Sequence, residues 1–292
     1  MVKLELDIPE KFYDDEYLSD FQVTSRMKKV WAVELDLLNK LLKVCDKYKI
    51  KFYMDGGSLL GTIRHAGFIP WDDDIDVVML RPEYEKLCSV ANKEFSYPYF
   101  FQNYFTEKEY TRGHAQLRNS ETTAILNNEK SMNLKTNQGI FIDIFVLDGV
   151  NENSSKMKKQ ESKVNFIKKL MYIKVLQTSR FKLVNKLSSF VPWKMLALFY
   201  DRALKMSKVE NSSKIANLGL GFDFGKSVTI RDKTFYDECI FMPFEMLNVP
   251  VPKRYDEWLT LRYGNYMKPS KAGTIHSGIF FDTEKSYKEY TE

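Results

Sequence analysis

The chain has 292 residues, of which 44% are apolar and 28% charged, and its formal net charge is +5. An aromatic content of 14% excludes a disordered chain, and the length allows one large domain or two small ones. No apolar run reaches the roughly 18 to 20 residues that span a bilayer, and the acidic start does not resemble a secretory signal. Three cysteines without a CxxC pair are typical of a reduced protein, so we expect a cytoplasmic location.

Helices and strands are predicted to alternate in the first part of the chain. From the N-terminus these elements are a helix over 24–49, a strand over 51–55, a helix over 58–65, a strand over 75–80 and a helix over 82–94. Thr24 is suited to cap the first helix, Gly67 to end the second and Pro82 to begin the third.

The rest of the chain is predicted to add strands, a basic helical region and a mixed C-terminal region. Its elements are strands over 99–104, 114–126 and 139–147, helices over 156–208 that break near Pro192, strands over 227–231 and 241–252, and a helix over 255–263. The apolar run at 139–147 is typical of a strand buried on both faces. These elements indicate an α/β or α+β fold with an added helical layer.

Acidic residues gather where the strand over 75–80 begins. Asp74 and Asp76 are two residues apart, so strand alternation places both carboxylates on one face, and Asp72 joins them if the extended backbone starts earlier. Crowded carboxylates repel one another unless a cation neutralises them. Oxygen ligands of this kind suit Mg²⁺ or Mn²⁺, so the sequence predicts a metal site.

Asp143 interrupts the apolar run of a second strand, where burying a lone acid is costly. That cost is explained if its strand lies beside the one that carries Asp74 and Asp76. Three carboxylates can then hold two metal ions about 3.5 to 4 Å apart, the usual arrangement for displacement at phosphorus. The alternative is that Asp143 accepts a backbone hydrogen bond at a strand end.

The residues Gly56, Gly57 and Ser58 follow a strand and open a short helix. Glycines let backbone N–H groups approach phosphate oxygens closely, the helix N-terminus adds favourable partial charge, and the serine hydroxyl adds a donor. Arg64 follows about two turns later and can bind a diphosphate with its forked guanidinium. A simple turn is the alternative for the glycines alone.

The few histidines do not form a zinc motif. His65 and His276 are candidates for contact with substrate, whereas His114 is expected to pack or cap, because no HxH or HExxH spacing occurs. Trp71 follows a proline turn, where it can stack on a base or sugar or simply belong to the core.

The segment from Lys156 to Lys208 carries fourteen basic residues against two acids, Glu161 and Asp201, a local net charge of +12 that leaves −7 for the remaining chain. Apolar residues are interleaved with these charges. Two interpretations remain: a structural helical layer with a solvated lysine face, or a surface for anionic lipid headgroups or a lipid-linked glycan. Nucleic acid is not expected as a partner, because no binding module is recognisable.

The motifs resemble the LicD family, which includes bacterial phosphocholine transferases, and more distantly the fukutin-related transferases. The resemblance is strongest in GGSLLGTIRHAGFIPWDDDIDVVM at 56–79, and it extends to FIDIFVLDG at 141–149, LRNSETTAI at 117–125 and MPFEMLNVPVPKRYDEWLTLRYGNYM at 242–267. It leaves out 151–208. It implies a nucleotidyltransferase fold, a mixed sheet flanked by helices, to which the basic helical region is added.

The resemblance also implies roles for particular residues. Asp74 and Asp76 would be the metal-binding pair and Asp143 the third carboxylate and possible activator of the acceptor hydroxyl, while Arg64 and Arg118 are candidates for the donor diphosphate. The loop between the Gly-Ser turn and the acids is longer than in many nucleotidyltransferases, which implies a different donor pocket. We divide the chain into an N-terminal segment (1–23), a catalytic core (24–150), the basic helical region (151–210) and a C-terminal region that completes the active site (211–292).

The reaction implied by the family is attack of a glycan hydroxyl on the distal phosphorus of a CDP-activated donor such as CDP-choline, CDP-glycerol or CDP-ribitol. CMP would leave, and the acceptor would be a cell-surface glycan or teichoic acid precursor, carried on a lipid and reached from the inner face of the cytoplasmic membrane. Two alternatives remain. A true nucleotidyltransferase would release pyrophosphate, and a non-catalytic scaffold would have no need of Asp74, Asp76 and Asp143 together.

Overall fold

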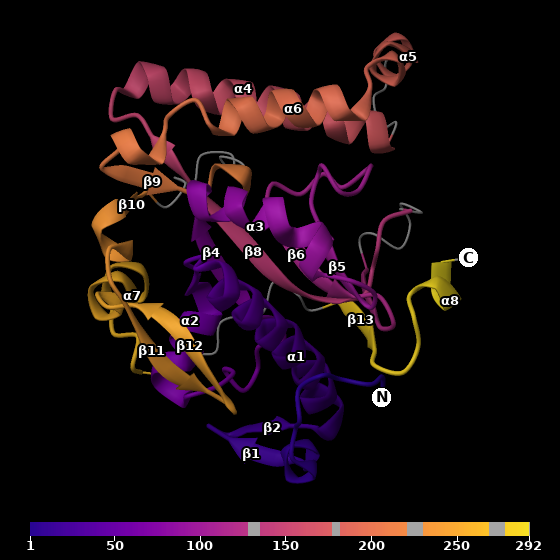
Figure 1. Ribbon diagram of the computed structural model, residues 1–292, viewed down its shortest axis with the longest axis vertical. Helices are drawn as coiled ribbons and strands as arrows, with labels where there is room; N and C mark the ends of the chain where they lie inside the picture. Colours follow the sequence, from indigo (N-terminus) through magenta and orange to yellow (C-terminus); the bar gives the residue numbers. More distant parts are fainter. Residues whose placement is uncertain (128–134, 177–181, 221–229, 269–277, 292) are drawn as a thin grey trace.

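The computed structural model describes residues 1–127, 135–176, 182–220, 230–268 and 278–291. Its main sheet contains β3 (Tyr53–Met54), β4 (Asp76–Leu80), β5 (Tyr99–Gln102), β6 (Ala115–Asn119), β8 (Ile140–Val150), β9 (Lys214–Ala216) and β10 (Arg231–Asp232). Its α-helices are α1 (Ser25–Tyr48), α2 (Gly56–His65), α3 (Arg81–Glu94), α4 (Ser154–Leu176), α5 (Lys182–Phe190), α6 (Trp193–Leu204), α7 (Tyr255–Tyr263) and α8 (Lys288–Thr291). A mixed sheet with flanking helices confirms the predicted fold class (Figure 1).

Strand β8 is the centre of the sheet. It pairs in parallel with β4 and antiparallel with β6, and its last residues pair antiparallel with β9. The edges are built by β3 against β4, β5 against β6 and β10 against β9. Since β8 has partners along both sides, nearly all of its residues are buried, as the apolar run predicts.

Small two-stranded sheets surround this core. They are formed by β1 (Glu16–Leu18) with β2 (Phe21–Val23), β7 (Thr123–Leu126) with β13 (Ile279–Asp282), and β11 (Cys239–Phe244) with β12 (Leu247–Pro252). Short 3₁₀ turns cover Glu10–Tyr13, Val209–Asn211, Leu218–Leu220 and Lys233–Tyr236. The β11–β12 hairpin packs on β3, α1 and α2, so the C-terminal part of the chain lies against the elements that carry the acids.

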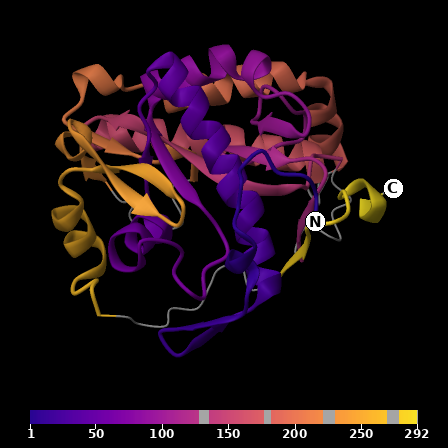
Figure 2. The same ribbon diagram turned by 60° about the horizontal axis from the view of Figure 1, so that its bottom comes forward.

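Helix α1 lies across the sheet and supplies much of the core (Figure 2). It begins as predicted, with the Thr24 hydroxyl accepting a hydrogen bond from the N–H of Met27 at 3.3 Å. Helix α2 is longer than predicted, because it already begins at Gly56, and the residue that ends it in the left-handed conformation is Ala66, with φ of 52°, rather than Gly67.

Two predicted single strands are each two strands in the structure. Residues 114–126 divide into β6 and β7, because Asn119 closes a turn between them. Its side-chain oxygen accepts a hydrogen bond from the N–H of Glu121, and its backbone carbonyl accepts one from the Thr122 hydroxyl. Residues 241–252 form the β11–β12 hairpin, which turns at Glu245 with φ of 53°. The strand predicted at 227–231 falls largely outside the described residues, and β10 begins at Arg231.

The basic segment forms a helical layer of α4, α5 and α6 along one side of the molecule (Figure 1). Pro192 stands at the N-cap of α6, where the predicted break occurs. The layer has a small core of its own, which includes Val164, Met171, Leu196 and Tyr200. Within the described part of the chain, no helix is long and apolar enough to cross a membrane.

Candidate metal and phosphate site

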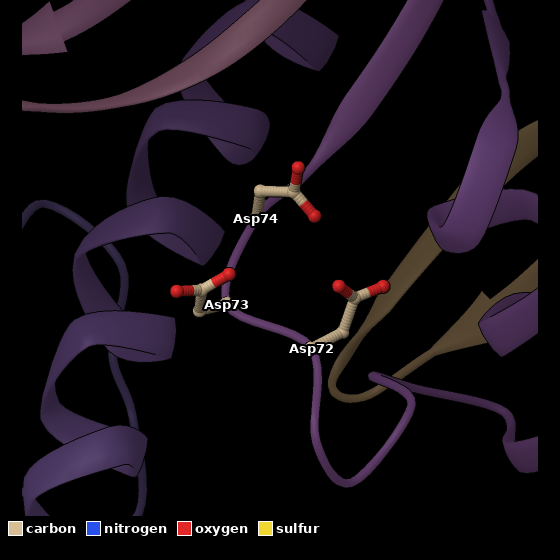
Figure 3. A group of neighbouring side chains, drawn as sticks. All are labelled: Asp72, Asp73 and Asp74. Carbon is tan, nitrogen blue, oxygen red and sulfur yellow. The ribbon is translucent and has the colours of Figure 1, made fainter. Parts of the chain in front are cut away.

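Three aspartates gather in the loop before β4. Asp72, Asp73 and Asp74 each offer one carboxylate oxygen, and these oxygens lie within 4.8 Å of one another. Figure 3 shows Asp73 pointing toward the indigo α1 helix, away from the side to which Asp72 and Asp74 turn. Asp74 lies in the loop and not in the strand, because β4 begins only at Asp76. Asp73 was not among the predicted ligands.

Two more acids lie next to each other where β4 and β8 run side by side. Asp76 and Asp143 are direct neighbours in the parallel register, which confirms that the two strands are adjacent. Gln116 stands opposite Asp143 on the other side of β8, and its amide donates to the Asp143 Oδ1 at 2.7 Å. The His114 Nε2 lies 3.1 Å from the same oxygen. Strand pairing therefore fixes Asp143 from both sides.

The pKa values of these two neighbouring carboxyls shift in opposite directions. Burial, followed by the charges of Asp74 and Asp143, raises the pKa of Asp76 well above its ordinary value. Burial acts in the same sense on Asp143, but His114 and the hydrogen bond from Gln116 lower its pKa to about 2. The Oδ1 of Asp76 is buried and accepts no hydrogen bond from the described residues. Such an oxygen among like charges fits a bound cation, which would supply the missing partner.

The first turn of α2 packs directly against these acids. A Cβ atom added to Gly56 would lie 2.8 Å from the Asp76 Oδ2, and one added to Gly57 would lie 2.4 Å from the Asp72 Oδ2. The Ser58 hydroxyl accepts the N–H of Asp76 at 2.7 Å. Gly56, Gly57 and Ser58 therefore hold the aspartates against a helix N-terminus, whose partial positive charge also favours phosphate.

A buried ion pair secures this turn from the C-terminal region. Asp55, the N-cap residue of α2, accepts two hydrogen bonds from Arg231, at 2.9 and 2.7 Å, and both side chains are buried. Burial would raise the pKa of Asp55, but the Arg231 charge lowers it below its ordinary value. The Asp55 N–H also donates to the carbonyl of Asp76 at 3.0 Å. The pair thus links β10 to the start of β4.

The predicted arginines occupy different surroundings. Arg64 is partly buried, and its Nη1 donates to the Tyr266 carbonyl at 3.0 Å, while the neighbouring His65 is also partly buried. Arg118 is buried between strands, where it donates to the Gly139 carbonyl at 2.6 Å and to the side chains of Gln102 and Gln116. Arg118 therefore helps to hold the Gln116 side chain in place.

The remaining predicted residues are Trp71, which directly precedes Asp72 in the chain, and His276. Trp71 packs edge to face against Phe21, with ring centroids 6.2 Å apart. His276 lies outside the described residues. Its role stays a prediction.

The structure adds site residues that the sequence analysis missed. Glu34 on α1 is 1% exposed, and burial together with the charges of Asp74 and Asp73 raises its pKa well above the ordinary value. The positive charge of Arg112 acts on Asp143. An acid inside the apolar stretch of a predicted helix was the available signal for Glu34. Gln116 is revealed by the strand register, and His114, which directly precedes β6, by its contact with Asp143.

A parallel strand pair that carries two acids beside a glycine-rich helix start is an arrangement suited to metal-assisted phosphoryl chemistry. A sequence model of the LicD/FKTN/FKRP nucleotidyltransferase domain matches residues 49–185. The lipopolysaccharide cholinephosphotransferase LicD of Haemophilus influenzae is 32% identical over 249 residues, which cover 80% of this chain and 88% of the relative. The chain therefore belongs to the LicD family.

Two further relatives match shorter stretches. An uncharacterised protein of Rickettsia prowazekii is 33% identical over 92 residues, which are 27% of this chain and 35% of that protein. One of Rickettsia typhi is 37% identical over 68 residues, which are 23% of this chain and 22% of that protein.

Proposed function

We propose that the chain is a metal-dependent transferase that moves phosphocholine from CDP-choline to a hydroxyl of a lipopolysaccharide glycan and releases CMP. The observation that carries this proposal is the direct pairing of Asp76 with Asp143 beside the first turn of α2. The printed name of the Haemophilus relative supports the transferred group and the acceptor. The CDP-activated donor is what the family resemblance implies, and the crowded carboxylates support the metal dependence.

The carboxylates of Asp72, Asp74, Asp76 and Asp143 would hold Mg²⁺ or Mn²⁺. The cation would supply positive charge to the reacting phosphate and to the departing CMP oxygen. Arg64 and the backbone of Gly57 would bind the donor diphosphate.

Transfer then requires an acceptor hydroxyl in line with the phosphocholine phosphorus. A new P–O bond forms as the bond to the CMP phosphate oxygen breaks, and the hydroxyl proton of the acceptor passes to solvent water. Asp143, whose pKa is lowered to about 2, stays ionised at neutral pH and can orient the hydroxyl as well as bind metal. Gln116 and His114 keep its carboxylate in place.

The decisive experiment identifies the small product. The protein is incubated with a glycan acceptor, Mg²⁺ or Mn²⁺, and in turn CDP-choline, CDP-glycerol, CDP-ribitol and ordinary nucleoside triphosphates. Metal-dependent release of CMP with CDP-choline is expected. Preference for another CDP donor, or for a teichoic acid acceptor, would change the transferred group or the acceptor in the proposal. Pyrophosphate release from a triphosphate would replace it with nucleotidyl transfer.

We also propose that the helical layer contacts an anionic membrane, where a lipid-linked acceptor would be found. A groove of about 550 Å³ between α4 and α6 is lined by apolar side chains such as Phe166, Phe199 and Met206, with Lys163 and Arg202 beside them. Phe166 is 63% exposed. Exposed aromatic rings among cations match the interface of an anionic bilayer, where each basic residue contributes about 1 kcal/mol.

Sedimentation with lipid vesicles tests this contact. The wild-type protein should sediment with phosphatidylglycerol vesicles at low salt and much less with phosphatidylcholine vesicles. Reversing four exposed lysines of α4 to Glu should weaken sedimentation, and these are Lys158, Lys159, Lys163 and Lys169. A matched variant reverses four exposed lysines outside the layer, Lys3, Lys43, Lys51 and Lys93. Equal loss in both variants, or no sedimentation of the wild type, would refute the contact.

A further inference from the structure

Glu34 is an acid in the middle of α1 that faces the aspartate loop. It is 1% exposed, and its Oε2 is buried without a hydrogen-bond partner among the described residues. Trp31 lies three residues earlier on the same helix, and its indole Nε1 donates to the Asp72 carbonyl at 3.0 Å. Residues three apart share a helix face, so Glu34 faces the loop that Trp31 contacts.

After burial, the largest charge effects on Glu34 all come from negative groups. They belong to Asp74, Asp73, Asp72 and Asp143. A buried carboxylate is costly unless it is paired or coordinates a metal, and none of the strongest charge effects on Glu34 comes from a basic group. Within the described part of the chain, the strongest charge effects on Glu34 therefore include none of opposite sign.

A second buried acid on the same helix shows what a structural role looks like. Asp36 is also 1% exposed, but its carboxylate accepts from the Tyr99 hydroxyl at 2.7 Å and from the N–H groups of Glu5 and Leu6 at 2.8 and 2.7 Å. The fold thus satisfies Asp36 completely and leaves Glu34 with an unused oxygen.

We propose that Glu34 is a further carboxylate of this cation site: it would bind the divalent ion from the side of α1, in addition to the aspartates named above, and Asp73, which turns toward α1, would join it. The proposal rests on the metal dependence of the proposed function. An additional oxygen from a rigid helix suits Mg²⁺ or Mn²⁺, which prefer carboxylates and water in a fixed arrangement. In this role Glu34 would also keep the loop in one position relative to α1.

The test measures binding of Mn²⁺ alone, without nucleotide, by calorimetry on the purified full chain. Glu34→Gln keeps the shape of the side chain and removes its charge, and Asp36→Asn is the matched control on the same helix. Loss of even an outer-shell group that orients a metal ligand weakens affinity by about 10- to 100-fold, so loss of a direct ligand should weaken it at least as much. We expect Glu34→Gln to bind Mn²⁺ at least about tenfold more weakly, and Asp36→Asn to bind like the wild type.

Thermal unfolding of the metal-free variants separates the two roles. Glu34→Gln should unfold at the wild-type temperature or above, because it removes a charge from a repulsive cluster, whereas Asp36→Asn should unfold earlier. Wild-type Mn²⁺ affinity in Glu34→Gln, or a loss of stability like that of Asp36→Asn, would overturn the proposal. Glu34→Asp, which keeps the charge, should bind Mn²⁺ more weakly than the wild type, and unchanged affinity there would equally count against it. A protein that binds Mn²⁺ in this way but releases no CMP would refute the proposed reaction and leave this inference standing.

Discussion

Replacing Arg231 by Met should destabilise the protein through the charge that it leaves behind. The variant keeps an apolar stem over the Trp258 ring, from which the guanidinium carbon is 4.4 Å away, but leaves Asp55 buried and unpaired. Breaking a buried ion pair in this way costs about 3 to 5 kcal/mol. For a chain of this size each kcal/mol lowers the unfolding midpoint by about 2 to 4 °C, so a decrease of roughly 6 to 20 °C is expected.

Thermal unfolding followed by circular dichroism measures this decrease, and Arg254→Met is the matched control. Arg254 also lies over an aromatic ring, that of Phe235, but its partner Glu257 is exposed, so the midpoint should hardly move. Asp55→Asn combined with Arg231→Met should recover part of the loss. Equal midpoints for the two single arginine variants would refute the reasoning.

The pH dependence of the same variant follows from the lowered pKa of Asp55. A carboxyl with a lowered pKa in the folded state adds stability above its ordinary pKa of about 4, and that stability is lost as the pH falls through the folded value. The variant loses this contribution, so the difference between its midpoint and that of the wild type should shrink below about pH 4. A difference that stays constant down to pH 3 would contradict the ion-pair interpretation.

Two further predictions concern the acids and the glycine turn. Asp76→Asn should abolish CMP release at saturating Mg²⁺ while the fold survives. Because the pKa of Asp76 is raised, the metal-free wild type should lose stability as the pH rises above about 4, and this decline should be smaller in the variant; near-normal turnover would refute the metal assignment. Gly57→Val should weaken binding of a CDP donor in calorimetry, since even its Cβ would lie 2.4 Å from the Asp72 carboxylate; unchanged affinity would move the donor pocket elsewhere.

The elements that carry the site follow closely from sequence patterns. Apolar periodicity and Thr24 locate α1, and the interrupted apolar run locates β8 with Asp143 inside it. The adjacency of β4 and β8 was predictable because a lone buried acid needs a reason to be there. The hydrophobic pattern and the cost of burying an acid are local properties, so they can be read from a single sequence.

The contacts that refine the site depend on packing that no local pattern contains. Gln116 reaches Asp143 only through the register of β6 against β8, and Arg231 reaches Asp55 across 176 positions of the chain. Asp73 and Glu34 were not predicted because their proximity depends on how α1 packs against the loop before β4. Turn chemistry explains the divided strands, since Asn119 closes a turn in a run that otherwise alternates.

The central position of β8 limits how the length of this chain can vary. Asp143 pairs across to Asp76, and five residues later Asp148 binds Arg81 through two hydrogen bonds of 2.6 and 2.8 Å. Five steps along a strand place the two acids on opposite faces. One inserted residue between them would turn Asp148 toward the face that carries Asp143 and remove it from the buried Arg81. Insertions and deletions should therefore be excluded from β8 and tolerated in surface loops, so that the number of residues between Asp143 and Asp148 should be constant among related chains.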